Sequence, residues 1–154
     1  MNKIALITGA SSGMGKSTAK ILQSQGYKVY GAARRLEEMQ DLKDNGMSIV
    51  SLDLTKDESI VNCVNTILSK EGKIDILINN AGYGSYGAVE DVSIEEAKRQ
   101  FEVNMFGLAR ITQLVLPKMR ENEFGRIVNI SSMGGKIYTP LGAWYHATKH
   151  AVEG

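Results

Sequence analysis

The chain has 154 residues, of which 43% are apolar and 23% are charged, and its formal net charge is +1. These values are ordinary for one globular domain, so we expect a single domain over residues 1–154. A charge this close to zero gives no bulk attraction to nucleic acid or anionic lipid, and no apolar run is long enough to cross a membrane. The one cysteine, Cys63, excludes an internal disulfide and fits a reducing compartment, so we expect a cytoplasmic protein.

Five short apolar runs along the chain have the length of β-strands and end in glycine or polar residues. Several are continuously apolar rather than alternating, which is typical of strands buried on both faces of a parallel sheet. Helical patterns separate them, so we predict an α/β fold: a doubly wound parallel sheet with a layer of helices on each side. The predicted strands are residues 3–8, 27–33, 47–52, 73–78 and 126–130.

The helices between these strands carry start and stop signals. Thr55 with Glu58, and Ser93 with Glu96, have the spacing of capping boxes at helix N-termini. Pro117 lies near the end of the helix that follows Ser93 and should kink or weaken its last turns. The predicted helices run from the glycine-rich turn after residue 8 to about Gln25, over residues 36–45, from Thr55 to Gly72, from Ser93 to about Met119, and onward from near Pro140.

The segment TGASSGMGKS, residues 8–17, fits two phosphate-binding patterns. As a relaxed Walker A loop it would direct Lys16 to the terminal phosphates of a mononucleotide and use Ser17 to hold magnesium. A Walker loop also needs an aspartate after a buried strand, a place that Asp53 could fill. As a dinucleotide-binding turn, TGxxxGxG, the segment would bind a pyrophosphate through backbone N–H groups and leave Lys16 facing solvent.

The end of the second strand favours the dinucleotide interpretation. A carboxylate about 20 residues past such a turn would favour NAD. Ala33 stands there instead, and Arg34 and Arg35 follow at once. A guanidinium at this point can pair bidentately with the 2′-phosphate of NADP. The alternative is that Arg34 and Arg35 are simply the solvated start of a helix.

Tyr145 and Lys149 form a YxxxK pattern, which places a phenol and an ammonium group on one face of a helix. A nearby cation stabilises a phenolate, so such a pair can transfer protons near neutral pH, although the same spacing is common on structural helices. Ser132 lies just past the fifth strand, at the carboxyl end of the sheet. A hydroxyl there can bind a substrate carbonyl oxygen or merely cap a turn.

Two asparagines join these candidates. Asn80, in the NNAG segment at residues 79–82, follows the fourth strand and lies in the same crevice, unless the segment is a simple turn. Asn104 lies in the middle of a predicted helix, where asparagine is unfavourable. Its side chain, or a locally loosened backbone around it, could hold a water molecule; the alternative is a tolerated helical asparagine.

The motifs that carry chemistry appear in this order: TGASSGMG, Asp53, NNAG, Asn104, Ser132 and Tyr145-x-x-x-Lys149. Their order and spacing closely resemble the compact, single-domain branch of the short-chain dehydrogenase/reductase family, over the whole chain. The resemblance implies a Rossmann-type sheet with strand order 3-2-1-4-5. It also implies an oxidoreductase that transfers hydride between nicotinamide and a carbonyl or secondary alcohol. NADP(H) is the expected cofactor, and NAD(H) is less favoured because of Arg34.

The same resemblance assigns roles to individual residues. Tyr145 would be the acid/base that gives a proton to the carbonyl oxygen, and Lys149 would assist it and bind the nicotinamide ribose. Ser132 would orient the substrate oxygen, and Asn104 would hold a water that links Lys149 to solvent. No metal ligand is expected. The residues expected to bind the cofactor are Gly9, Ser11, Ser12, Gly13, Met14, Gly15, Arg34, Asp53, Leu54, Asn80, Ala81, Gly82, Tyr145 and Lys149.

Members of this family usually extend well beyond 154 residues, so the resemblance implies a domain that is incomplete at its C-terminus. The last strands of the sheet and the segments that close over the substrate would be missing. The fifth strand would then be a sheet edge, and we expect little or no turnover from the 154-residue chain alone. The full-length form is expected to be a homodimer or homotetramer, with a small carbonyl or alcohol as substrate. Residues between Ser132 and Tyr145 suggest a partly apolar pocket wall.

Two further functions are compatible with the sequence. The chain could be a non-catalytic dinucleotide-binding fragment or a redox sensor, an alternative favoured by its length and opposed by the intact Tyr145 and Lys149. It could also be a P-loop NTPase, in which Lys16 would be essential for nucleotide binding.

Overall fold

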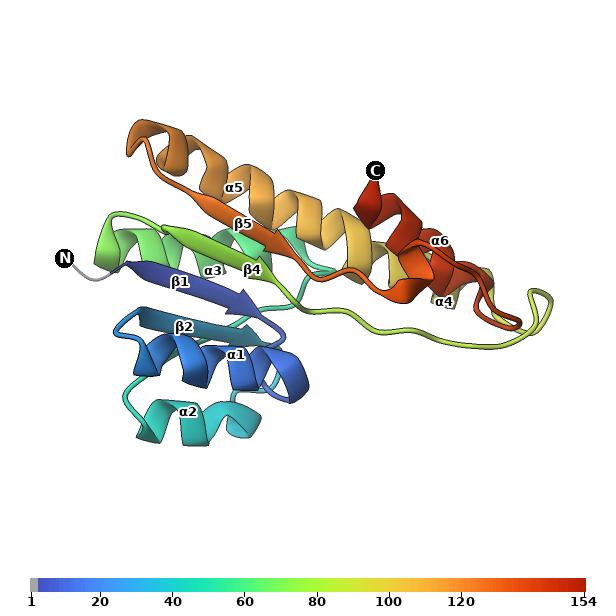
Figure 1. Cartoon of the computed structure of the whole chain (residues 1–154), viewed down its shortest axis with the longest axis horizontal. Helices are drawn as coiled ribbons and strands as arrows, with labels where there is room; N and C mark the ends of the chain where they lie inside the picture. Colours follow the sequence, from blue (N-terminus) through green and yellow to red (C-terminus); the bar gives the residue numbers. More distant parts are fainter. Residues whose placement is uncertain (1–2) are drawn as a thin grey trace.

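The computed structural model describes residues 3–154, which form a five-stranded sheet with helices on both faces (Figure 1). All neighbouring strands are parallel, and their order across the sheet is β3-β2-β1-β4-β5. The predicted fold class and strand order are therefore confirmed. The strands are β1 (Ile4–Thr8), β2 (Lys28–Ala33), β3 (Ser48–Ser51), β4 (Ile76–Asn79) and β5 (Arg126–Asn129).

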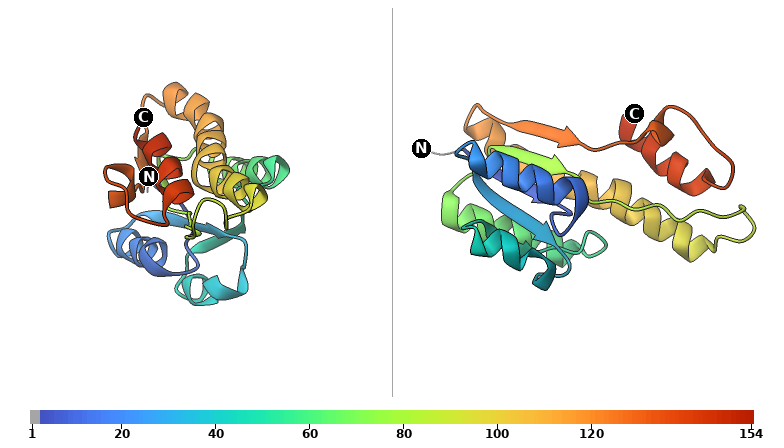
Figure 2. Two further views of the ribbon diagram at one scale, coloured as in Figure 1. Left: turned by 90° about the vertical axis from the view of Figure 1, so that its right-hand side faces the viewer. Right: turned by 60° about the horizontal axis from the view of Figure 1, so that its bottom comes forward.

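The helices form the two outer layers, with α1 and α2 on one face of the sheet and α3 and α5 on the other (Figure 2). Successive residues of β1 point to opposite faces, so Leu6 packs with the α3–α5 layer and Ile7 with the α1–α2 layer. The α-helices are α1 (Gly13–Ser24), α2 (Gln40–Asp44), α3 (Asp57–Glu71), α4 (Ile94–Phe101), α5 (Gly107–Glu121) and α6 (Ala143–Glu153). Shorter pieces are the 3-10 turns η1 (Glu37–Met39) and η3 (Met133–Gly135) and the π-helical turn η2 (Glu102–Phe106).

The start of α3 differs from the prediction. α3 begins at Asp57, and its N-cap residue is Lys56. Thr55 instead closes a turn on Asp53, because its N–H and its hydroxyl both donate to Oδ1 of that residue, at 3.0 and 2.7 Å. The predicted capping box of Thr55 and Glu58 is therefore wrong.

Of the predictions for the helical segment that contains α4 and α5, the N-terminal cap is confirmed and the single long helix is not. Ser93 caps α4, since its Oγ accepts a hydrogen bond from the N–H of Glu96 at 3.2 Å, so the cap predicted there is confirmed. Pro117 lies inside α5, but the helix continues beyond it to Glu121. The long predicted helix is interrupted by η2, which separates α4 from α5.

β4 begins at Ile76, three residues later than predicted. The residue before it, Asp75, is buried, and its carboxylate accepts a hydrogen bond from the N–H of Ile4 at 2.7 Å. The N–H of Asp75 also donates to the Ile4 carbonyl oxygen at 2.9 Å, so Asp75 joins β1 through both its backbone and its side chain, and the regular ladder begins with Ala5 and Ile76.

β5 forms one edge of the sheet, and its outer side is open. Arg126, Val128 and Asn129 are all exposed. The prediction that the fifth strand ends the sheet of this chain is therefore confirmed. In residues 3–154, no helix combines the length and the apolar character needed to cross a membrane.

Candidate active site

A pocket of about 560 Å³ lies at the carboxyl ends of β1, β2, β3 and β4, where the loops after these strands meet. In a doubly wound sheet this is the crevice where ligands bind, next to the point at which the strand order reverses. It gathers segments that are far apart in the sequence. Of the residues predicted to bind a cofactor, those that line it are Gly9, Ser11, Ser12, Gly13, Met14, Arg34, Asp53, Leu54, Asn80, Ala81 and Gly82.

The turn between β1 and α1 brings backbone atoms to the pocket because its glycines permit close approach. Gly9 has a φ of +68°, and a Cβ atom on Gly15 would lie 2.4 Å from both the Gly9 carbonyl oxygen and Asn80 Nδ2. Gly15 therefore lies beneath the turn instead of lining the pocket. Within the described residues, the side chain of the N-cap residue Ser12 makes no capping hydrogen bond, which leaves the first N–H groups of α1 for a phosphate.

The NNAG segment holds this turn in place. The Asn80 side chain donates to the carbonyl oxygens of Thr8 and Gly9, at 3.1 and 3.3 Å. The backbone N–H groups of Asn80 and Ala81 donate to the Thr8 hydroxyl at 3.1 and 3.0 Å. These bonds fix the end of β4 against the end of β1, so Asn80 supports the turn from behind as well as lining the pocket.

Arg34 lines the pocket just past β2, and no carboxylate among residues 3–154 forms an ion pair with it. Its neighbour Arg35 is paired with Glu38 at 2.8 Å. Asp53 lines the same pocket. Burial alone would raise the pKa of Asp53, but the hydrogen bonds from Thr55 together with the charges of Lys56 and Arg34 leave that pKa lowered. Arg34 is thus a cation without a carboxylate partner, while Asp53 stays ionised.

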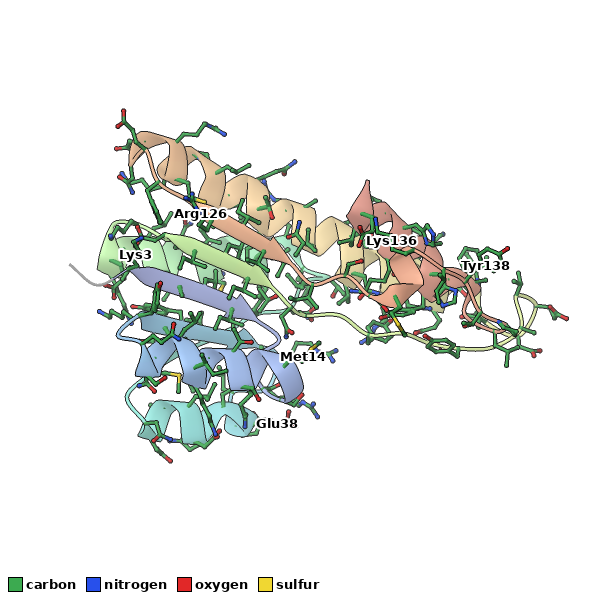
Figure 3. All side chains as sticks on the ribbon, in the orientation of Figure 1. Lys3, Met14, Glu38, Arg126, Lys136 and Tyr138 are labelled. Carbon is green, nitrogen blue, oxygen red and sulfur yellow. The ribbon has the colours of Figure 1, made fainter. Side chains whose placement is uncertain are left out.

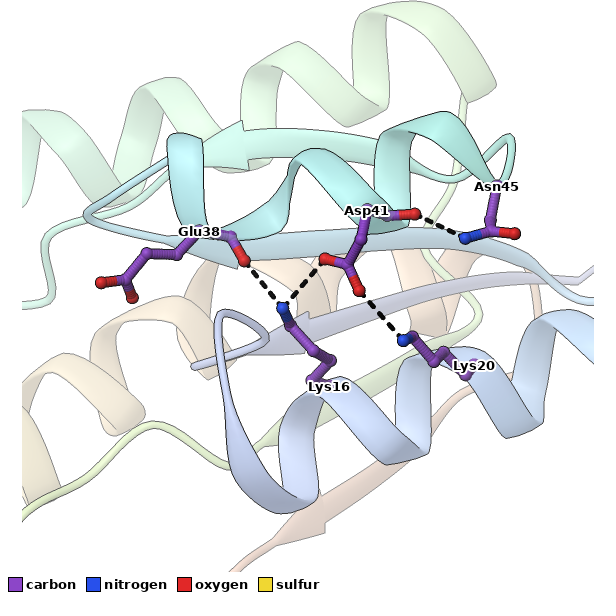
Figure 4. Close-up of polar contacts among 5 residues, drawn as sticks. All are labelled: Lys16, Lys20, Glu38, Asp41 and Asn45. Carbon is purple, nitrogen blue, oxygen red and sulfur yellow. Dashed lines mark hydrogen bonds and ion pairs between the residues drawn. The ribbon is translucent and has the colours of Figure 1, made fainter.

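Lys16 points away from the pocket, toward α2 (Figure 4). Its Nζ atom donates to Oδ1 of Asp41 at 2.9 Å and to the carbonyl oxygen of Glu38 at 2.8 Å, and Lys20 pairs with the other oxygen of Asp41. The expectation that Lys16 faces solvent is therefore wrong, because η1 and α2 each supply a partner for it. A Walker lysine would have to reach the bound phosphates, but the Nζ atom of Lys16 is bound to Asp41 and to the Glu38 carbonyl oxygen instead.

Asn104 lies in the π-helical turn η2, where the helical hydrogen-bond pattern is locally widened. Its side chain is buried. The Oδ1 atom accepts from the N–H of Tyr83 at 3.0 Å, and Nδ2 donates to the Tyr83 carbonyl oxygen at 2.8 Å and to Thr148 Oγ1 at 3.0 Å. Asn104 therefore joins the segment after β4 to α6, from a backbone that is loosened around it.

Lys149 is buried next to Asn104. Its Nζ atom donates to the carbonyl oxygen of Ile130 at 2.8 Å and lies 5.9 Å from the ring centroid of Tyr145. Burial lowers the pKa of Lys149. A Cβ atom on Gly82 would lie 3.1 Å from Asn104 Oδ1 and 3.6 Å from Lys149 Nζ. Asn104 and Lys149 therefore both lie next to Gly82, which lines the pocket.

Ser132 and Tyr145 both lie close to Gly134. Oγ of Ser132 accepts from the N–H of Gly134 at 3.1 Å, and a Cβ atom on Gly134 would lie 3.4 Å from Cε1 of Tyr145. The Tyr145 ring also faces the Tyr86 ring, at 5.6 Å between centroids. The four predicted catalytic residues thus share one neighbourhood beside the pocket, although none of them lines it.

Besides Ala32, Ala33, Arg35 and Leu52, which lie at the ends of β2 and β3, four further side chains line the pocket that the sequence had not marked as cofactor-binding. They come from the segment after β4, from α4 and from η2, and one of them adds a third arginine to Arg34 and Arg35. Only one had been singled out, as half of a capping box, and none belongs to a motif. In the sequence alone, nothing separates these four residues from ordinary helix or loop residues. They are Tyr83, Glu96, Arg99 and Val103.

A doubly wound parallel sheet with a glycine-rich turn at its switch point and a pocket beyond it defines a protein of the Rossmann dinucleotide-binding type. The family follows from comparison with known proteins. A family model described as short chain dehydrogenase matches residues 3–154. The chain belongs to the short-chain dehydrogenase family, which confirms the resemblance seen in its motifs.

Individual relatives agree with this assignment. A 3-ketodihydrosphingosine reductase of Bacteroides thetaiotaomicron is 43% identical over 152 residues, which cover 99% of this chain and 55% of the relative. A short-chain dehydrogenase structure from Streptomyces avermitilis matches with a TM-score of 0.96 at 41% identity, covering 99% of this chain and 57% of that one. A metagenomic short-chain oxidoreductase in complex with NADP matches with a TM-score of 0.91 at 30% identity, covering 98% and 72%. The chain thus spans about half the length of the curated relatives it matches.

Proposed function

We propose that this chain is the cofactor-binding and catalytic part of an NADP(H)-dependent oxidoreductase acting on a carbonyl or a secondary alcohol. The gathering of the four predicted catalytic residues beside a pocket that contains the unpaired Arg34 carries this proposal. Similar solved structures include complexes with NADP and NADPH. The relative that is 43% identical is named as a reductase of a keto compound, which supports a carbonyl substrate. Residues 1–154 form one dinucleotide-binding domain in this proposal.

The residues present fit a dinucleotide. Close packing at Gly9 and Gly15 leaves room for backbone atoms only, so a pyrophosphate could lie against the turn and the N-terminus of α1. Arg34 would bind the 2′-phosphate through a charge-assisted pair, since no carboxylate of the described residues neutralises it. Asp53 and Leu54 would contact the adenine. When bound, the nicotinamide ring supplies or accepts the hydride.

The proton chemistry falls to side chains of this chain. Tyr145 gives a proton to the carbonyl oxygen in reduction and takes it back in oxidation. Ser132 Oγ accepts from Gly134, so its own proton is free to donate to the same substrate oxygen. Lys149 makes one hydrogen bond, to Ile130, within the described residues. Its remaining ammonium protons can reach ribose hydroxyls while its charge stabilises a phenolate.

Asn104 has the role of a water holder in this proposal. Its Nδ2 donors are taken by Tyr83 and Thr148, and its Oδ1 atom accepts one bond from Tyr83. The second lone pair of Oδ1 can accept from a water next to Gly82 and Lys149. Such a water would relay protons between Lys149 and solvent.

Binding can be tested on the chain itself. Its single tryptophan, Trp144, precedes Tyr145 and gives an intrinsic fluorescence signal for titration with NADPH and NADH. We expect NADPH to bind at least about tenfold more tightly. Equal or tighter binding of NADH would overturn the cofactor assignment. In a turnover-competent form of the protein, Tyr145→Phe should lower the rate of ketone-dependent NADPH oxidation about a hundredfold or more and leave NADPH affinity nearly unchanged.

A further inference from the structure

His146 follows Tyr145 in α6 and is buried, with 6% of its surface exposed. The proposed chemistry gives it no role. A histidine is seldom buried without partners for its ring nitrogens, and here both nitrogens face one residue of a neighbouring loop. This loop, residues 134–142, leads from Ser132 to the start of α6 and is called the 134–142 loop below.

The two ring nitrogens of His146 hold the middle of the loop. The N–H of Thr139 donates to Nδ1 at 3.2 Å, and the Thr139 hydroxyl lies 3.5 Å from Nε2. A backbone N–H can only donate, so Nδ1 carries no proton and accepts. The proton of the neutral ring is then on Nε2, facing the hydroxyl oxygen of Thr139.

The ring also packs against both ends of the loop. A Cβ atom on Gly134 would lie 2.7 Å from Cδ2 of His146, and one on Gly142 would lie 2.6 Å from Cε1. Both positions therefore admit only glycine next to this ring. The 134–142 loop is wrapped around the imidazole, which fills the space between its two ends.

The outer side of the loop is apolar and exposed. Ile137, Tyr138 and Leu141 have 52%, 86% and 58% of their surface exposed, and Tyr138 projects from the end of the molecule opposite the N-terminus (Figure 3). Leu141 adopts a left-handed φ of +65°, and its carbonyl oxygen accepts from the N–H of Gly87 at 2.9 Å. The loop is therefore held in a strained shape by His146 and by the backbone bond from Gly87, while its three apolar side chains stay exposed.

We propose that His146 is a positioning residue: its neutral imidazole, accepting at Nδ1, fixes the 134–142 loop beside Tyr145 and thereby holds Ser132 and Tyr145 in their relative positions. The inference rests on the proposed function, which makes Tyr145 the proton donor. Gly134 links the two roles, because it touches the rings of both His146 and Tyr145 and donates to Ser132. Loss of the acceptor would free the loop and the surroundings of both reacting hydroxyls together.

The protonation of His146 can be read directly. The chain has only two histidines, so a long-range ¹H–¹⁵N spectrum of histidine-labelled protein resolves them, with His150→Asn as the assignment control. We expect an Nε2–H tautomer for His146, with Nδ1 unprotonated. A proton on Nδ1 would overturn the proposal, since the Thr139 bond could not then exist.

Amide hydrogen exchange at Thr139 measures whether the acceptor holds the loop. His146→Leu removes the acceptor and should speed exchange about tenfold, whereas His146→Asn can place its carboxamide oxygen near Nδ1 and should stay within about threefold of the parent chain. The control His150→Asn, on the exposed side of the same helix, should change nothing.

The outcomes separate this inference from the proposed function. Equal exchange in the Leu and Asn variants, or no change in either, would overturn the positioning role. If the Leu variant fails to fold, the Asn variant and the tautomer of the parent chain still decide it. NADPH affinity should stay within about twofold in the Asn variant, because His146 does not line the pocket. A parent chain that binds no NADPH would instead overturn the proposed function and leave the loop measurements valid.

Discussion

The Nζ atom of Lys16 and the Oδ1 atom of Asp41 lie 2.9 Å apart, and this ion pair ties α1 to α2 (Figure 4). The GKS ending of the glycine-rich turn therefore contributes to helix packing. Phosphate binding at this turn depends instead on backbone N–H groups and on the close packing of Gly9 and Gly15. Helix packing by Lys16 and phosphate binding by the turn can therefore be separated by mutation.

Lys16→Ala should leave NADPH affinity within about twofold, because the side chain does not reach the pocket. Gly15→Ala should weaken NADPH binding at least about tenfold, since its Cβ atom would lie 2.4 Å from Asn80 Nδ2 and the Gly9 carbonyl oxygen and must displace the turn. Tryptophan fluorescence titration checks both. A large loss in Lys16→Ala, accompanied by ATP binding in the parent chain, would restore the P-loop interpretation.

Asp41→Asn should make the free energy of unfolding depend less on pH at acidic pH. Hydrogen bonds from Lys16 and Lys20 hold the pKa of Asp41 at about 2, below its ordinary 3.8. A carboxylate with a lowered folded-state pKa contributes stability that is fully present above about pH 4 and is lost as the pH falls toward about 2. Urea midpoints measured across this window should fall more steeply in the parent chain than in the variant.

A matched control for that experiment is Asp44→Asn on the same helix. Asp44 accepts from Gln40 alone and has no lysine partner among the described residues, so its variant should follow the parent curve. If Asp41→Asn and Asp44→Asn gave the same acid limb, the two lysines would not be coupled to Asp41 in solution.

Most of the fold could be predicted because the signals are local. The buried run of β1, the glycine turn after it and the Ser93 cap are each legible within a few residues. Where partners are distant in sequence, local signals failed. Thr55 looked like a cap but closes a turn on Asp53, and the buried Asp75 before β4 has its side-chain partner, the N–H of Ile4, on another strand.

In the candidate site, too, residues marked by local signals could be predicted, and residues placed by distant contacts could not. Motif residues such as Asn80 and Arg34 could be chosen from the sequence because their position after a strand places them at the carboxyl edge. Arg99 could not, since a helical arginine is ordinary until the packing of α4 brings it to the pocket. The partner of Lys16 was equally hidden, because it depends on how two helices lie against each other.

Arg34→Ala should weaken NADPH binding far more than NADH binding. Losing a charge-assisted pair with the 2′-phosphate costs about 1.5–3 kcal/mol, or roughly ten- to a hundredfold in affinity. NADH lacks that phosphate, so its affinity should change by less than about threefold. Arg35→Ala is the matched control, because Arg35 lines the same pocket but is paired with Glu38 at 2.8 Å. Equal losses for both cofactors would show that Arg34 contacts a part they share.

Asn104→Asp should destabilise the fold although it preserves the shape of the side chain. The Nδ2 group now donates to the Tyr83 carbonyl oxygen and to Thr148, and a carboxylate would turn an acceptor toward that carbonyl at a buried position. We expect the free energy of unfolding to fall by about 1–3 kcal/mol, measured by urea denaturation. Asn122→Asp, at the exposed C-terminal end of α5, is the control and should stay within about 0.5 kcal/mol. An unchanged Asn104→Asp variant would mean that α6 and the segment after β4 hold together without this side chain, and that Asn104 is not what links Tyr83 to the helix of Tyr145.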